Sequence, residues 1–179
     1  MGLIIRTVVC KDCGLVYTNP RLDTVENKMF YQHFYKIFFR GEDWPSVRHV
    51  ENQNRKARLA DKYLRDNGLD INQVSSVLDV GCSAGGMLDY FRSCGVSNLI
   101  GIEPSVNFAE FARNEFNLEV YTTTLEDFLD ENVDRKFDLV IMRDVIEHLL
   151  DPKKVLNTLQ KYYMISQCYL LKQIMCLKA

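Results

Sequence analysis

An apolar run that ends in an acid and continues into a turn of small residues constrains this chain more than any other feature. Residues 77–88 read VLDVGCSAGGML. The pattern predicts a buried strand, a turn over residues 81–86 (the glycine turn) and the start of a helix. This arrangement directs backbone N–H groups and a helix N-terminus at whatever lies above the turn. We therefore expect a nucleotide-like ligand there.

The spacing of the glycines indicates which nucleotide-like ligand fits. Aligned with the dinucleotide pattern G-x-G-x-x-G, the three key positions are Gly81, Ser83 and Gly86. A pyrophosphate approaches the backbone at the middle glycine, which is a serine here. The turn therefore disfavours a dinucleotide and favours a ligand without phosphate at this point, such as S-adenosylmethionine.

Two later segments predict the same kind of fold. Residues 98–104, NLIGIEP, read as a second buried strand, and Glu103 lies about 20 residues beyond the turn, where such folds place the acceptor for ribose hydroxyls. Residues 137–149, FDLVIMRDVIEHL, read as a further strand whose carboxyl end points at a site. Helical patterns over 47–66, 87–94 and 108–116 alternate with these strands, which predicts a parallel sheet.

These motifs resemble the class I S-adenosylmethionine-dependent methyltransferases, in particular the branch with a small cysteine-bearing N-terminal element. The resemblance rests on VLDVGCSAGGML, LIGIEPS and FDLVIMRDVIEHLLDP, and on CKDCGLVYTNPR near the start, and it covers residues 8 to about 155. It implies an α/β fold in which a Rossmann-like parallel sheet of strand order 3-2-1-4 is flanked by helices and preceded by a small knuckle.

The chemistry of this methyl donor assigns roles to the strand ends. Asp79 would face the ammonium group, and by resemblance Glu103 would take the ribose hydroxyls while the backbone of the glycine turn passes beneath the methionine part. Residues 124–126 would flank adenine, and residues 142–144 would close the pocket. The predicted cofactor-binding residues are Asp79, Gly81, Cys82, Ser83, Ala84, Gly85, Glu103, Pro104, Thr124, Leu125, Met142, Arg143 and Asp144.

Structural roles compete with several of these assignments. Asp79 could cap the turn, Glu103 with Pro104 could be a plain strand end, and Leu125 could be a core residue. Methyl transfer is mainly a matter of positioning, so no catalytic residue is assigned. Glu147 and His148 are candidates for a base, but the pattern favours a structural pair.

Cys10 and Cys13 are spaced so that two thiolates can share one metal ion. A structural zinc site needs four ligands, and no second C-x-x-C pair precedes this one or occurs within the next hundred residues. The sequence thus predicts half a zinc site, with an inert reduced pair as the alternative. Related methyltransferases usually carry another pair before this one, so the resemblance implies that the chain begins late.

The two ends of the chain depart from the body. Residues 30–39, FYQHFYKIFF, followed by Trp44, suit either a helix packed on the sheet or a lid over the pocket. We expect residues 1–45 to form the partial knuckle and aromatic segment, and residues 46–179 the methyltransferase domain. Residues 161–176 contain no Gly, Pro, Asn or Asp and are expected to continue as a helix, which would leave the domain without its later strands. The fourth strand would then be an open edge through which the chain could self-associate.

Charge indicates which partners the chain lacks, and cysteine content indicates its compartment. The formal charge is -2 with both signs interleaved, which predicts no nucleic-acid footprint and no membrane-binding stretch. The six cysteines form no secreted framework, so we expect a reducing cytoplasm.

Three functional hypotheses follow. The first is an S-adenosylmethionine-dependent methyltransferase acting on a small-molecule or sugar-like acceptor. The second is a truncated donor-binding module without activity, and the third, disfavoured by Ser83, is a nicotinamide-dependent oxidoreductase.

Overall fold

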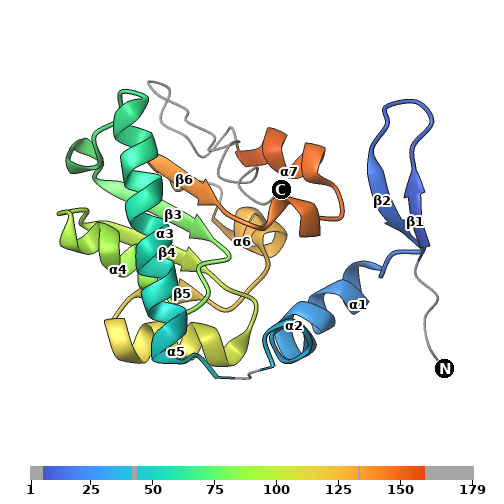
Figure 1. The fold of residues 1–179 in the computed structure, drawn as a ribbon, viewed down its shortest axis with the longest axis horizontal. Helices are drawn as coiled ribbons and strands as arrows, with labels where there is room; N and C mark the ends of the chain where they lie inside the picture. The colour runs from blue at the N-terminus through green and yellow to red at the C-terminus, as the bar shows by residue number, and fades with distance from the viewer. Residues whose placement is uncertain (1–5, 42–43, 133, 160–179) are drawn as a thin grey trace.

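A four-stranded parallel sheet forms the centre of the protein (Figure 1). The computed structural model describes residues 6–41, 44–132 and 134–159. The strands lie in the order β5-β4-β3-β6, which is third, second, first and fourth along the domain, as the sequence predicts. The bounds are Ser76–Val80 for β3, Asn98–Ile102 for β4, Glu119–Tyr121 for β5 and Leu139–Met142 for β6. The predicted α/β fold with a parallel central sheet is confirmed.

Helices cover both faces of this sheet. One layer contains α3 (Val47–Asp66), α4 (Gly86–Ser93) and α5 (Val106–Phe116), and the other contains α6 (Leu125–Glu131) and α7 (Pro152–Leu159). Figure 1 shows α3 crossing the sheet on one side. The long helix predicted after Ser46, with a stop at Asn67 and Gly68, is therefore confirmed.

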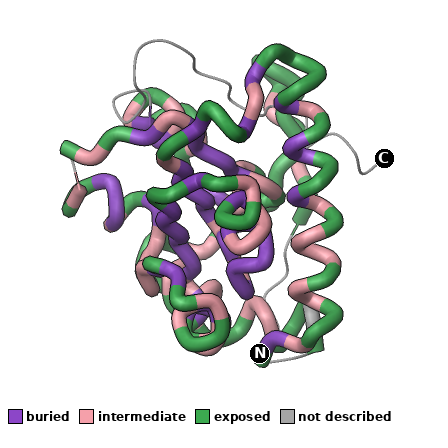
Figure 2. Tube along the Cα trace, turned by 90° about the vertical axis from the view of Figure 1, so that its left-hand side faces the viewer, coloured by how far each residue is buried: buried purple, intermediate pink, exposed green. Residues whose placement is uncertain are grey.

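Alternate residues of each strand enter different halves of the core. Val77 and Ile141 belong to the apolar cluster under α3, α4 and α5, whereas Leu78 and Val140 belong to the cluster under α6 and α7. This division follows from the two-residue period of a strand. Figure 2 shows the buried residues concentrated along the inner strands. Asp79 lies two residues after Val77 on β3, so its side chain lies on the face of the sheet that α3 covers.

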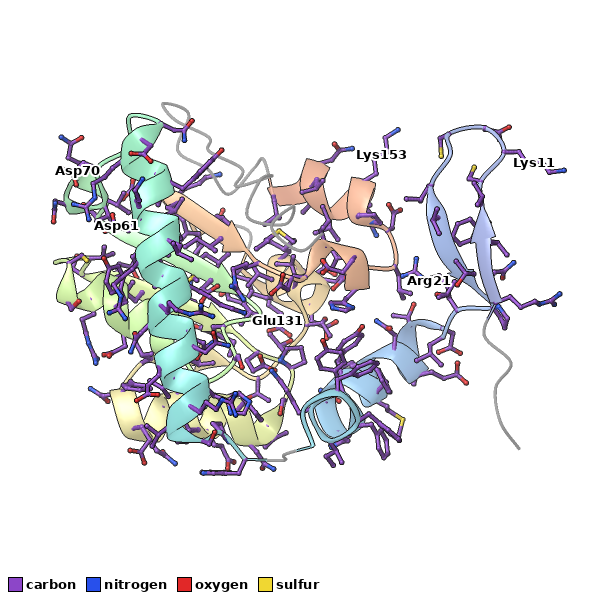
Figure 3. The ribbon with its side chains drawn as sticks, viewed as in Figure 1. Lys11, Arg21, Asp61, Asp70, Glu131 and Lys153 are labelled. Atoms are coloured by element: carbon purple, nitrogen blue, oxygen red, sulfur yellow. The ribbon has the colours of Figure 1, made fainter. Side chains whose placement is uncertain are left out.

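Residues 6–41, called the N-terminal segment below, lie beside the carboxyl ends of the strands. They begin with an antiparallel hairpin of β1 (Arg6–Val9) and β2 (Val16–Asn19). The hairpin is followed by α1 (Thr24–Met29), a π-helical turn (Phe30–Phe34) and α2 (Tyr35–Arg40). Arg21, labelled in Figure 3, donates from Nη2 to the carbonyl of Leu149 at 2.8 Å. Lys28 pairs with Asp127 at 2.6 Å. Two contacts from separate points thus attach the segment to the domain.

The aromatic part of this segment is not core. No residue of α1 or of the π-helical turn is buried, and Phe38 and Phe39 are 73% and 69% exposed. The structure therefore does not bury this segment as a core helix, and its role as a lid stays a prediction.

Two expectations about the C-terminal end lie outside the described residues. The helical continuation after α7, and with it the open edge at β6, depend on residues 160–179. Within the described ranges, no helix has both the length and the apolar character needed to cross a membrane.

β4 passes close to the glycine turn at Gly101. A Cβ atom at Gly101 would lie 2.6 Å from Sγ of Cys82, which is itself fully buried. We expect Gly101→Ala to lower the free energy of unfolding by about 1–3 kcal/mol through overpacking, measured by chemical denaturation. In a Cys82→Ala background the same substitution should cost clearly less. An equal loss in both backgrounds would contradict this contact as the cause.

Candidate functional site

One cavity lies at the carboxyl ends of the parallel strands, where ligands bind in open α/β sheets. Its walls come from the ends of β3, β4 and β6, from the start of α6, from α3 and from the N-terminal segment. Nine of the predicted cofactor-binding residues line it: Asp79, Gly81, Ser83, Glu103, Pro104, Thr124, Leu125, Arg143 and Asp144. The sheet thus brings together residues that are far apart in the sequence.

The other four predicted residues do not line this cavity. Cys82, Ala84, Gly85 and Met142 are all buried. Sγ of Cys82 packs under Gly101, as described above. The expectation for residues 81–85 concerns their backbone beneath the methionine part, and it stays a prediction.

Two non-glycine residues at the cavity adopt left-handed backbone conformations. Ser83 has a φ of 52°, and Asp144, just beyond β6, has a φ of 54°. Serine thus stands where the dinucleotide pattern has its middle glycine, and the backbone there still takes a conformation that favours glycine. Such strained positions concentrate at functional sites.

The N–H groups of the glycine turn are largely used inside the protein. Gly81 and Cys82 both donate to the carbonyl of Ile102, at 2.8 and 3.0 Å. Gly85 donates to the carbonyl of Cys82 at 3.0 Å. These bonds fasten the turn to the end of β4 and remove donors that a phosphate would need.

Gln53 on α3 clamps the glycine turn from the other side. Its Nε2 donates to the carbonyl of Cys82 at 2.8 Å, and its Oε1 accepts from the N–H of Gly86 at 3.1 Å. Gly85, at the cap position of α4, has no side chain to cap the helix. Gln53 therefore supplies that cap from a distant part of the chain.

Sequence reasoning missed Gln53, although a signal was present. It lies on the apolar stripe of α3 that Val50, Ala57, Ala60 and Leu64 define, and a polar residue on such a stripe must find buried partners. A Cβ at Gly86 would lie 3.0 Å from Cβ of Gln53, which explains why glycine stands at that helix start.

Glu103 is the most constrained acid of the site. Its Oε2 accepts from the N–H of Ser83 at 2.9 Å, and its Oε1 accepts from the N–H of Ser105 at 2.9 Å. The ammonium group of Lys36 lies 3.5 Å from Oε2. The carboxylate therefore joins the glycine turn, the start of α5 and the N-terminal segment.

Asp79 is the second acid in the cavity. Burial raises the pKa of Asp79 to about 7, Arg143 opposes the rise, and the charge of Glu103 adds to it. A carboxyl group with this pKa is partly protonated near neutrality, so it can ionise when a cation arrives.

His148 and Tyr31 meet at the wall formed by the N-terminal segment. The hydroxyl of Tyr31 and Nδ1 of His148 form a hydrogen bond of 2.9 Å, and both residues line the cavity. Burial lowers the pKa of His148 and raises the pKa of Tyr31 to about 12, so both side chains are neutral at pH 7. Glu147 is exposed. The polar partner of His148 thus comes from the N-terminal segment rather than from the neighbouring acid.

Residues 10–14, which contain Cys10 and Cys13, form the turn between β1 and β2. The N–H of Gly14 donates to the carbonyl of Cys10 at 2.9 Å, and hydrogen bonds from the backbone of Cys13 and Asp12 lower the pKa of the Cys10 thiol. Among the described residues, no group of three or more His, Cys, Asp or Glu side chains could hold a metal ion. Zinc at Cys10 and Cys13 stays a prediction.

Comparison with known proteins gives one family match. A family described as "Methyltransferase domain" matches residues 50–167, which is more than half of the chain. The chain is also 28% identical over 100 residues to a mitochondrial ubiquinone biosynthesis O-methyltransferase of Dictyostelium discoideum. That match covers 48% of this chain and 31% of the relative. The chain therefore spans about a third of the length of this curated relative.

Two solved structures have a similar fold. Magnesium protoporphyrin IX methyltransferase from Synechocystis PCC 6803, with bound SAM, has a TM-score of 0.55 at 17% identity, covering 81% of this chain and 74% of that chain. The plantazolicin methyltransferase BpumL, in complex with a monoazolic desmethylPZN analog and SAH, has a TM-score of 0.52 at 17% identity, covering 78% of this chain and 56% of that chain. At these identities the likeness shows the fold alone.

The clamp formed by Gln53 makes a stability prediction. Gln53→Leu keeps most of the side-chain volume but leaves the Gly86 N–H and the Cys82 carbonyl without their partner. We expect the free energy of unfolding to fall by about 1–3 kcal/mol, measured by urea denaturation. The same substitution at the exposed Gln73 serves as the control and should change stability by less than about 0.5 kcal/mol. Equal effects at the two positions would rule out the clamp.

Proposed function

The chain belongs to a family of methyltransferase domains, and we propose that it binds S-adenosylmethionine in the cavity at the strand ends and transfers the methyl group to a small-molecule acceptor. The Glu103 carboxylate is the observation that carries this proposal. It is buried at the end of β4, and its two oxygens are oriented by the N–H groups of Ser83 and Ser105. A carboxylate held in this way can accept two hydroxyl hydrogen bonds from a ribose.

Asp79 would bind the other end of the donor. S-adenosylmethionine carries an ammonium group and a sulfonium, and a carboxyl group with a pKa of about 7 ionises readily beside a positive charge. Thr124 and Leu125 at the start of α6 would flank the adenine, and Arg143 with Asp144 would close the cavity beyond β6.

The bonding of the glycine turn favours this donor over a dinucleotide. The N–H groups of Gly81, Cys82 and Gly85 donate to backbone carbonyls, and that of Ser83 donates to Glu103. A pyrophosphate requires such donors for itself, whereas the donor proposed here carries no phosphate.

Methyl transfer requires the acceptor atom to lie in line with the bond between sulfur and methyl carbon. Tyr31, Tyr35 and His148 line the side of the cavity that the N-terminal segment covers, and they would contact the acceptor. A small molecule fits this enclosed position, and a sugar-like molecule is included in that class.

A second candidate is a donor-binding module without turnover, because most of the residues that line the cavity are assigned here to the donor. Turnover of this chain should be measured on a panel of acceptors, together with the binding of SAH. Binding of SAH without turnover of any acceptor would favour the module.

Donor binding makes the first test. SAH at 100 times its Kd should stabilise the protein by about 2.7 kcal/mol, because it binds only the folded state. This corresponds to a rise in Tm of about 5–10 °C in a scanning calorimeter for a chain of this size. NAD should leave Tm unchanged, and Glu103→Gln should abolish most of the SAH shift. A shift with NAD alone would contradict the proposal, and unchanged affinity in Glu103→Gln would contradict the ribose assignment.

The pH dependence of binding tests Asp79. Because its pKa is about 7 in the empty site, the ionised fraction rises with pH, and the donor's ammonium group binds the ionised form. Affinity for S-adenosylmethionine measured by calorimetry should therefore increase by about tenfold between about pH 6 and pH 8. Asp79→Asn should show only the titration of the ligand itself. The same pH profile in the variant would remove Asp79 from the ammonium site.

A further inference from the structure

The ammonium group of Lys36 lies directly against Glu103. Lys36 is on α2, and its Nζ is 3.5 Å from Oε2 of Glu103 and donates to Oγ of Ser83 at 3.1 Å. It also lies 4.3 Å from the centre of the Phe108 ring. The Lys36 and Glu103 side chains are only 11% and 5% exposed. The N-terminal segment thus places a nearly buried positive charge at the acid that would hold the ribose.

This lysine is compensated on every side by the site itself. A buried ammonium group is unfavourable unless it is paired, and here a carboxylate, a hydroxyl and an aromatic face together replace water. Glu103 in turn gains a cation in a place where it is shielded from solvent. Each partner therefore stabilises the other while the cavity is empty.

A ribose would need the same oxygen atoms. The Glu103 oxygens already accept from Ser83 and Ser105 through the backbone, so their remaining lone pairs serve either Lys36 or a pair of hydroxyls. A carboxylate has about four lone-pair sites, and the two N–H groups and Lys36 use three of them, so two ribose hydroxyls find their sites only after Lys36 leaves. Lys36 and a ribose-bearing ligand are therefore alternative occupants.

We propose that Lys36 is a built-in competitor of the donor: it occupies the hydroxyl-binding face of Glu103 in the empty protein and must leave before a ribose can bind. This inference rests on the proposed function of the cavity. On this proposal, the pairing of Lys36 with Glu103 is an autoinhibitory contact.

The contact sets the affinity for the donor. The measured Kd exceeds the intrinsic Kd by the inverse of the fraction of molecules in which Lys36 has left. If that fraction is about a tenth, removing the ammonium group strengthens binding about tenfold.

Calorimetric titration with SAH tests the competition. Lys36→Met retains the aliphatic stem and removes the charge, and we expect its Kd for SAH to fall about tenfold relative to the unaltered chain. Lys62→Met is the control, because it removes an exposed lysine that pairs with Asp66 on α3 and lies outside the cavity. Its Kd should stay within about twofold of that of the unaltered chain. Equal or weaker binding by Lys36→Met, or equal strengthening by both variants, overturns the proposal.

Lysine labelling of the unaltered chain gives a second readout that needs no variant. Acylation followed by mass spectrometry should modify Lys36 slowly in the empty protein and faster with saturating SAH, while the exposed Lys62 of α3 changes little. Stronger protection of Lys36 by SAH would make it a contact of the ligand and would overturn the competition. If neither the unaltered chain nor Lys36→Met binds SAH, the proposed function itself is wrong and the inference falls with it.

Discussion

The buried carboxylate of Glu103 holds together three parts of the molecule that are far apart in the sequence. It accepts from the N–H of Ser83 in the glycine turn and from the N–H of Ser105 at the start of α5, and it pairs with Lys36 of the N-terminal segment. A charged group this deeply buried is tolerated only when several donors compensate it. The position of the turn, the entry to α5 and the placement of α2 therefore depend on one side chain.

The glycine turn is held by a second interaction from the opposite side. Gln53 bonds both to the carbonyl of Cys82 and to the N–H of Gly86, so the turn lies between a carboxylate and an amide. Because the polar groups of the turn are already paired, a ligand meets the surface of the turn and the charge of the neighbouring Glu103 rather than free N–H donors. This distinguishes it from a phosphate-binding turn, although the two share a sequence pattern.

The sequence predicted the domain well because its signals are local and repeated. The strands at residues 76–80 and 98–102 are largely apolar, as expected in a sheet covered on both faces. Nine predicted site residues reach the cavity because the carboxyl ends of parallel strands meet at one edge. Cys82 and Met142 were assigned by resemblance, and their side chains are buried outside the lining of the cavity. Periodicity identifies a strand end without stating which of its side chains faces the ligand.

The sequence by itself determined the alternation of strands and helices, the glycine turn and the acid after the second strand, since these follow from hydrophobic pattern and short-range geometry. Only the tertiary structure decided what those features contact. Gln53 reaches the turn from 33 residues before Gly86, and Lys36 reaches Glu103 across 67 residues. Such pairings arise from how the layers pack, and no local pattern encodes them. Glu103, which the sequence identified as a ribose ligand, thus pairs in the folded protein with a lysine from the N-terminal segment.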